Sequence, residues 1–241
     1  MKLKEYINYL SDWVKEEVKK ANAEGVIIGL SGGIDSAVVA CIAQKAFPKD
    51  HLTVWINCES PSYDYTCAQE LIKLKNFNSI NLNLTGAYQQ LIEEIGSNAS
   101  LSGIARANTK SRLRMTTLYS IAQSKNYLVL GTDNADEWHI GYFTKHGDGA
   151  ADLLPIVHLL KREVKEAAQI LEVNEEIINR APSAGLWDNQ TDEKEIGVTY
   201  KVIDDYLSGK RVDSTSKKRI EHLNKITEHK RVTAPKPNKM K

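Results

Sequence analysis

The sequence predicts an α/β protein in which helices cover a parallel β-sheet. Short apolar segments typical of buried strands alternate with longer segments whose apolar residues recur at helical spacing. This alternation is typical of parallel sheets wound by right-handed crossovers. Two polar segments, SGGIDS at 31–36 and GTDNADE at 131–137, directly follow expected strands. Because ligands bind such sheets at the carboxyl ends of the strands, these two segments are the first candidates for a functional site.

Each element is expected from its own pattern. The opening helix places Leu3, Ile7, Leu10, Val14 and Val18 on one face. Glycines bound the first apolar strand, and the other strands are short apolar or alternating segments. We expect strands at 26–30, 52–56, 80–84 and 127–130. We expect helices at 3–20, 34–46, 63–75, 88–95, 102–124, 164–171, 193–207 and 217–227.

The composition is that of an ordinary globular protein. The chain has 241 residues, of which 41% are hydrophobic and 26% charged, and its formal net charge is +1. This balance argues against nucleic acid or an anionic membrane as partner, and no apolar stretch is long enough to span a bilayer. We expect one domain over 1–241, with a flexible tail at 233–241.

The cysteines indicate a reducing compartment. Cys41, Cys58 and Cys67 are odd in number and form no CxxC pair. A zinc site or a disulfide framework is therefore not expected, and a cytoplasmic protein is.

The segment SGGIDS has the chemistry of a phosphate-binding loop. Gly32 and Gly33 allow an anion close to the main chain, and the N–H groups at the start of the next helix attract negative charge. Ser31 and Ser36 add hydroxyl donors. Asp35 would repel a phosphate unless a cation lay between them, so we infer Mg²⁺ there. The alternative is a plain turn between strand and helix; no lysine follows to make a Walker A motif.

The extended segment GLSGGIDS at 29–36 resembles the pyrophosphate-binding loop of the N-type ATP pyrophosphatases, which include synthetases of NAD, GMP, asparagine and argininosuccinate. The resemblance implies a Rossmann-like, adenine nucleotide alpha hydrolase-like fold that binds ATP. It implies ATP contacts from Gly29, Leu30, Ser31, Gly32, Gly33, Ile34, Asp35 and Ser36. The loop alone does not indicate the second substrate.

A longer segment narrows the family. Residues 131–155, GTDNADEWHIGYFTKHGDGAADLLP, resemble the most distinctive stretch of the ammonia-dependent NAD synthetases. SRLRM before this stretch, and LLKREV, GVTYKVIDDYLSGK and TEHKR after it, agree in the family's order. The resemblance implies a ligase that uses ATP and Mg²⁺ to amidate deamido-NAD with ammonia. An NAD-adenylate would form, and AMP, pyrophosphate and NAD would be released in the last step of NAD biosynthesis, by a homodimer.

The same resemblance implies roles for ATP-site residues. Thr132, Lys161 and Ser183 would contact ATP, and Glu137 would join Asp35 in holding Mg²⁺. Lys161 would offset charge on the departing pyrophosphate. Without the resemblance, Glu137 could equally be a solvated charge on a helix. Ser183 stands where the family commonly has threonine, and Asn134 where it commonly has histidine.

A second set of residues would bind deamido-NAD by resemblance: Arg112, Lys145, Asp152, His229 and Lys230. Asp152 is also expected to act in catalysis with Asp35 and Lys161, and either it or Asp148 could deprotonate ammonium. On residue type alone, Lys145 and Asp152 could form a surface ion pair, and the C-terminal pair could belong to a basic tail. Arg114 could contact substrate or be a helix-surface charge.

The nitrogen donor follows from what precedes the first strand. Glutamine-using NAD synthetases carry a nitrilase-like amidase domain, whereas only the 3–20 helix comes before the first strand here. We therefore expect free ammonia as donor. Two rival interpretations stay open: another adenylating pyrophosphatase, including a tRNA-modifying enzyme, and a nucleotide-binding module without catalysis. The 102–124 helix could be a dimer interface or simply cover the sheet.

Overall fold

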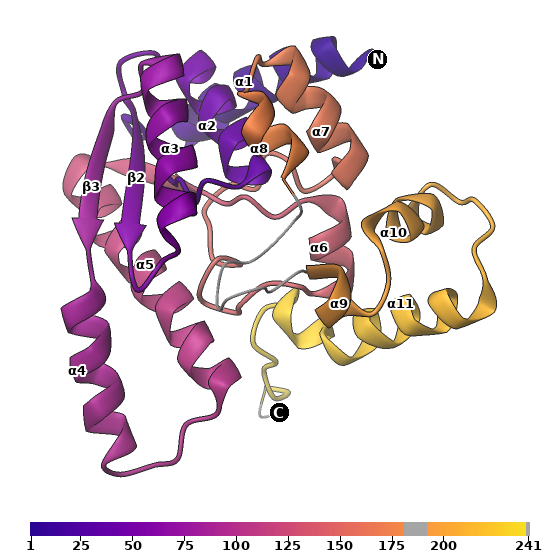
Figure 1. Cartoon of the computed structure of the whole chain (residues 1–241). Helices are drawn as coiled ribbons and strands as arrows, with labels where there is room; N and C mark the ends of the chain where they lie inside the picture. The colour runs from indigo at the N-terminus through magenta and orange to yellow at the C-terminus, as the bar shows by residue number, and fades with distance from the viewer. Residues whose placement is uncertain (181–191, 240–241) are drawn as a thin grey trace.

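The protein is built on a four-stranded parallel sheet with strand order β3-β2-β1-β4 (Figure 1). The computed structural model describes residues 1–180 and 192–239. The strands are β1 (Gly25–Gly29), β2 (His51–Asn57), β3 (Ser79–Asn83) and β4 (Tyr127–Leu130). In register, Val26 pairs with His51 on one side and with Leu128 on the other. The α/β fold and the parallel sheet predicted from the sequence are confirmed.

Helices cover both faces of the sheet. One face carries α1 (Leu3–Lys20), α2 (Ile34–Ala46) and α7 (Lys161–Ile170), which pack on one another. With α3 (Ser62–Lys75) and α8 (Glu175–Asn179) they enclose the larger apolar core. α2 is well covered, and nine of its 13 residues are buried. This packing holds the N-terminus of α2 rigidly at the end of β1.

The opposite face is covered by α5 (Gly103–Lys125), which packs on β1 and β4. Its residues Met115, Leu118 and Ala122 pack against Ile27 and Val129 of the sheet. The preceding helix α4 (Thr85–Gly96) and the first turns of α5 extend away from the sheet (Figure 1). Figure 1 therefore shows α5 both covering the sheet and projecting beyond it.

The mid-chain helix α6 and the C-terminal part form a separate helical layer beside the carboxyl edge of the sheet (Figure 1, right). It comprises α6 (Ala135–Ile140), α9 (Asp192–Ile196), α10 (Tyr200–Leu207), α11 (Ser214–Ile226) and the 3₁₀ helix η1 (Glu228–Lys230). A small core of Ile140, Ile196, Tyr200, Ile203 and Ile220 holds it together. Residues 233–239 form no helix or strand.

One expected helix was wrong. The predicted helix at 193–207 is two helices, α9 and α10, because Gly197 has a left-handed backbone (φ 82°). The Thr199 side chain then accepts a hydrogen bond from Val202 N and starts α10 as a new helix. The short elements α6, α8 and η1 were not predicted.

None of the helices in the described part of the chain is both long and apolar enough to cross a membrane.

Candidate active site

A cavity of about 420 Å³ opens at the carboxyl edge of the sheet. It lies between the loop after β1, the end of β4, α6 and the first residue of α7, and we call it the central cavity. Its lining includes these residues predicted to bind ATP or a metal: Gly29, Leu30, Ser31, Gly33, Ile34, Asp35, Ser36, Thr132, Glu137 and Lys161. Segments far apart in sequence thus meet where ligands bind parallel sheets.

The loop after β1 is preformed for an anion. Gly32 has a left-handed backbone (φ 84°), and a Cβ there would lie 2.4 Å from Asp64 O, so only glycine fits. Ser36 Oγ donates to Gly33 O (2.9 Å) and accepts from Ser31 N (3.2 Å), while Ser31 Oγ accepts from Gly33 N (3.2 Å). No side chain caps the N-terminus of α2. The start of α2, which borders the cavity, therefore has N–H groups of the kind that bind phosphate at helix N-termini.

Three charged side chains meet beside this loop, and we call them the acid–lysine cluster. Lys161 Nζ lies 2.6 Å from Asp35 Oδ2 and 3.0 Å from Glu137 Oε1. The ammonium also sits 4.7 Å from the ring centroid of Tyr200, whose hydroxyl donates to Glu137 Oε1 (3.0 Å). The three charged side chains are only 11–17% exposed. The cluster therefore holds one positive and two negative groups in a site with little water.

The electrostatics of the cluster follow from its burial. Burial raises the pKa of Glu137 to about 7, even though Lys161 acts in the opposite direction. Burial lowers the pKa of Lys161, but Asp35 and Glu137 outweigh it and the net pKa is raised. Lys161 therefore stays a cation beside the loop 31–36.

The acid–lysine cluster suits a magnesium ion in its donor chemistry. Asp35 and Glu137 are hard oxygen ligands that converge on one cationic group, so they already balance positive charge. Across residues 1–180 and 192–239, no group of three or more His, Cys, Asp or Glu side chains is arranged to hold a metal. This chain therefore offers two carboxylates as ligands for magnesium, and ATP oxygens and waters would complete the coordination shell.

Asn134 explains how the cluster is held. Its Oδ1 accepts from Glu137 N (3.0 Å) and so caps α6, while its Nδ2 donates to Asp35 Oδ1 (2.8 Å). One amide thus orients both predicted metal ligands. Sequence reasoning noted Asn134 only as a departure from the family. An asparagine directly before an acidic first turn is a helix-cap signal that could have revealed this role.

The residues predicted to bind deamido-NAD lie in two places. Arg112 Nε donates to Lys145 O (3.2 Å), and Lys145 Nζ donates to His229 O (2.5 Å). Lys230 follows His229 and lines the central cavity. Its ammonium donates to Gly141 O and Phe143 O, at 2.7 Å each. Four of the five residues thus form a continuous basic border between α5, the loop after α6 and η1.

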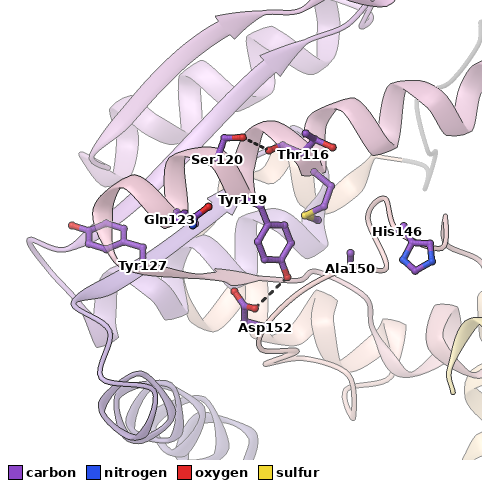
Figure 2. Close-up of a pocket in the computed structure, with 10 residues that line it drawn as sticks. Thr116, Tyr119, Ser120, Gln123, Tyr127, His146, Ala150 and Asp152 are labelled. Carbon is purple, nitrogen blue, oxygen red and sulfur yellow. Dashed lines mark hydrogen bonds between the residues drawn. The ribbon is translucent and has the colours of Figure 1, made fainter. Parts of the chain in front are cut away.

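Asp152 stands apart from the acid–lysine cluster. It lines a second hollow of about 570 Å³ between α5 and β4, which we call the α5–β4 groove (Figure 2). Asp152 Oδ2 accepts from Val129 N (2.7 Å) and Oδ1 from the Tyr119 hydroxyl (3.2 Å; Figure 2). Burial, reinforced by Asp152, raises the pKa of Tyr119 to about 12, so the phenol stays a donor. His146 borders the same groove (Figure 2).

Arg114 and Ser183 complete the set of predicted site residues. Arg114 was left between substrate contact and helix-surface charge, and the second alternative was wrong. Arg114 lines the central cavity, donating to Ile56 O (3.2 Å) and Ser60 Oγ (2.9 Å). Ser183, predicted to contact ATP, lies outside the described residues.

The parallel sheet, the preformed anion loop and the cavity at its carboxyl edge define an adenine nucleotide alpha hydrolase-like protein, as expected. The chain belongs to the NAD synthase family, because the profile of that family matches residues 6–234.

Individual proteins that are similar to this chain agree with its membership of the family. The chain is 57% identical to the NH(3)-dependent NAD(+) synthetase of Mesoplasma florum, over all of this chain and 99% of the relative. Its structure is similar to that of an NMN synthetase from Francisella tularensis (TM-score 0.95, 42% identity, 99% of both chains). It is also similar to an NH3-dependent NAD synthetase from Campylobacter jejuni in complex with nitrate (TM-score 0.82, 25% identity, 99% of this chain and 100% of that one).

Proposed function

We propose that this protein is an ammonia-dependent NAD synthetase. It joins ammonia to the carboxylate of deamido-NAD, forming NAD while ATP is split to AMP and pyrophosphate. The observation that carries the proposal is the acid–lysine cluster beside a preformed anion loop. This arrangement suits the departure of pyrophosphate from ATP, because fixed positive charge and N–H groups stabilise the leaving group as its charge grows.

The first step is adenylation. A carboxylate oxygen of deamido-NAD attacks the α-phosphorus of ATP, the bond to the β-phosphate oxygen breaks, and pyrophosphate leaves with the electron pair. The loop 31–36 binds the phosphates through backbone N–H groups and the Ser31 and Ser36 hydroxyls. Lys161 offsets the developing charge. Asp35 and Glu137 would hold Mg²⁺, which when bound supplies further positive charge to the phosphates.

The second step is aminolysis. Ammonia attacks the carbonyl carbon of the mixed anhydride, the bond from that carbon to the AMP oxygen breaks, and one proton is lost from nitrogen. No protein nucleophile is needed, so catalysis comes from positioning and charge stabilisation.

For deamido-NAD we propose the basic border of Arg112, Lys145, His229 and Lys230 and, beyond it, the α5–β4 groove. Lysine and arginine suit the pyrophosphate of a dinucleotide. Asp152 and the Tyr119 hydroxyl suit ribose or base-edge groups. In this arrangement Asp152 positions substrate through its groove contacts, and its direct part in the chemistry stays a prediction.

A second candidate substrate follows from the neighbour with TM-score 0.95, which is named NMN synthetase. A nicotinate mononucleotide carries the same reacting carboxylate and one fewer nucleotide unit. It would use the central cavity and the basic border without filling the rest of the α5–β4 groove.

The proposed function also implies a compartment, an oligomeric state and a domain extent for the enzyme. We propose a cytoplasmic homodimer whose single NAD synthetase domain spans residues 1–241. The three buried thiols Cys41, Cys58 and Cys67 are compatible with a reducing compartment. We expect the projecting α4 and α5 to supply the dimer contact.

The test is a product analysis with purified protein, ATP, Mg²⁺ and ammonium. Deamido-NAD and nicotinate mononucleotide are compared as acceptors, and pyrophosphate is followed with the amide product. Equal amounts of NAD and pyrophosphate, formed only with deamido-NAD present, support the proposal. A higher kcat/KM with the mononucleotide favours the second candidate. Pyrophosphate release without either amide would refute both.

A Lys145→Ala variant tests the assignment of the basic border. We expect a higher KM for deamido-NAD with little change in the KM for ATP, because Lys145 lies outside the central cavity lining. Equal losses for both substrates would contradict the assignment.

A further inference from the structure

Within residues 1–180 and 192–239, one carboxylate of the central cavity has no protein partner. Seven Asp or Glu residues line this cavity within the described chain: Asp35, Asp64, Asp133, Glu137, Asp148, Asp192 and Glu195. Six of them accept hydrogen bonds or ion pairs from protein groups. Asp133 is the exception, and its Oδ2 is buried with no hydrogen-bond partner in the part of the chain that the structure describes.

Burying the unpaired carboxylate of Asp133 costs free energy. The residue is only 3% exposed and lies directly after Thr132 at the carboxyl end of β4. A buried acceptor without a donor loses the hydrogen bonds it would make to water. Buried polar groups are nearly always paired, so an unpaired one at the wall of a cavity points to a donor carried by a ligand.

The charges around Asp133 indicate that this donor is a cation. Burial raises the pKa of Asp133 well above its usual value, and the nearby carboxylates Asp148, Glu137 and Asp35 raise it further. Lys230 acts the other way, but its ammonium already donates to Gly141 O and Phe143 O. A small positive ion beside Asp133 would offset both the burial and the surplus negative charge.

We propose that Asp133 binds the ammonium ion from which the new amide nitrogen comes. The inference rests on the proposed function, which requires ammonia and assigns no residue to bind it. Ammonium carries a full positive charge and four N–H donors on one atom, whereas ribose hydroxyls offer a donor but no charge. The predicted magnesium ligands, Asp35 and Glu137, already pair with Lys161.

Asp148 is another carboxylate near Asp133, but both of its oxygens are engaged. Its Oδ2 accepts from Thr144 N (3.1 Å), and its Oδ1 accepts from the Ser111 hydroxyl. These contacts fix the loop that carries Asp148. Its charge therefore adds to the field around Asp133, while Asp133 supplies the open acceptor.

The test is the Asp133→Asn variant with two nitrogen nucleophiles. Ammonium is charged near neutral pH, whereas hydroxylamine is mostly uncharged and needs no carboxylate to bind. Losing a charge-assisted hydrogen bond should raise the KM for ammonium by about 10- to 100-fold. The kcat/KM for hydroxylamine, followed as the hydroxamate product, should change by less than about threefold, since that nucleophile never paired with Asp133.

Asp205→Asn is the matched control, because it makes the same substitution on α10, outside the linings of the central cavity and of the α5–β4 groove. We expect it to leave the KM for ammonium and the KM for deamido-NAD within about twofold, since Asp205 pairs with Arg162 and Lys210 instead. Asp133→Ser, a second neutral variant, should reproduce the ammonium effect. Its agreement with Asp133→Asn would separate the loss of charge from any local misfolding.

Adenylation is measured separately as deamido-NAD-dependent exchange of labelled pyrophosphate into ATP without ammonium. If wild-type protein shows no exchange, the proposed function itself fails. If exchange is normal in wild type and in Asp133→Asn while the ammonium KM rises selectively, the ammonium site is supported. An unchanged ammonium KM, or equal losses with ammonium and hydroxylamine, would overturn it.

Discussion

Replacing Lys161 with methionine removes the only positive charge in the acid–lysine cluster and leaves a side chain of similar length. Lys161 Nζ lies 2.6 Å from Asp35 and 3.0 Å from Glu137. At an effective dielectric constant of about 20, each attraction is worth about 5–6 kcal/mol before desolvation is subtracted. Breaking a buried pair costs about 3–5 kcal/mol net, because the uncompensated charges stay behind. We expect a loss of that size in unfolding free energy at pH 8.

The loss should shrink in acid. Without Lys161, the two carboxylates face each other, so the folded protein gains stability when one of them takes up a proton. Glu137 already has its pKa raised to about 7 with the lysine present. Destabilisation by Lys161→Met should therefore be smaller at pH 5.5 than at pH 8, where taking up that proton costs more free energy.

Urea unfolding followed by tryptophan fluorescence measures both effects. The triple variant Lys161→Met, Asp35→Asn, Glu137→Gln is the control, since it removes the stranded charges together with the lysine. It should recover most of the stability yet stay inactive, because the charge that stabilises departing pyrophosphate is gone. A loss below about 1 kcal/mol, or a loss independent of pH, would refute the electrostatic account of the cluster.

Three further predictions concern the frame around the cluster. In Asp136, burial and the neighbouring Asp204 raise the pKa to about 8. Since this pKa exceeds that of an unfolded aspartate, protonated Asp136 contributes its full stabilisation below about pH 4. The stabilisation is lost as pH rises to about 8, by up to about 1.4 kcal/mol per pH unit. Asp136→Asn should therefore make the unfolding free energy from urea titrations depend less on pH. Gly141→Ala should lower the unfolding free energy by about 1–3 kcal/mol. The backbone there is left-handed, and a Cβ would lie 2.3 Å from Thr227; an unchanged thermal midpoint would contradict this. Asn134→Ala removes a helix cap and an amide donor to a carboxylate, so it should cost about 1–3 kcal/mol and lower kcat; full activity would show that the amide does not orient the predicted metal ligands.

The sheet and its anion loop were predictable because their signals are local. An apolar segment followed by a serine and two glycines determines where a strand ends and a helix begins, and β4 has the expected bounds. The split at Gly197 was missed because one glycine in a helical pattern is often tolerated, and only its left-handed backbone and the Thr199 cap decide the matter. The six-residue helix α6 is too short to display a period.

The cluster itself depends on contacts between distant parts of the chain. Asp35 and Lys161 are 126 residues apart, and their 2.6 Å contact exists only because α2 and α7 pack together. From the sequence, each of the two residues was predicted to contact ATP or a metal. Their pairing with each other could not be predicted. Asp133 was passed over for a similar reason, since its lack of a partner becomes visible only after every neighbouring donor has been placed.

The central claim is that the carboxylate of the substrate is adenylated in the central cavity. It is tested most directly with deamido-NAD whose nicotinate carboxylate carries ¹⁸O in both oxygens. After complete turnover with ATP, Mg²⁺ and ammonium, the AMP is analysed by mass spectrometry. The account predicts one ¹⁸O atom in each AMP and none in pyrophosphate, because the carboxylate oxygen that attacked the α-phosphorus leaves with AMP. Unlabelled AMP, or label in pyrophosphate, would contradict it.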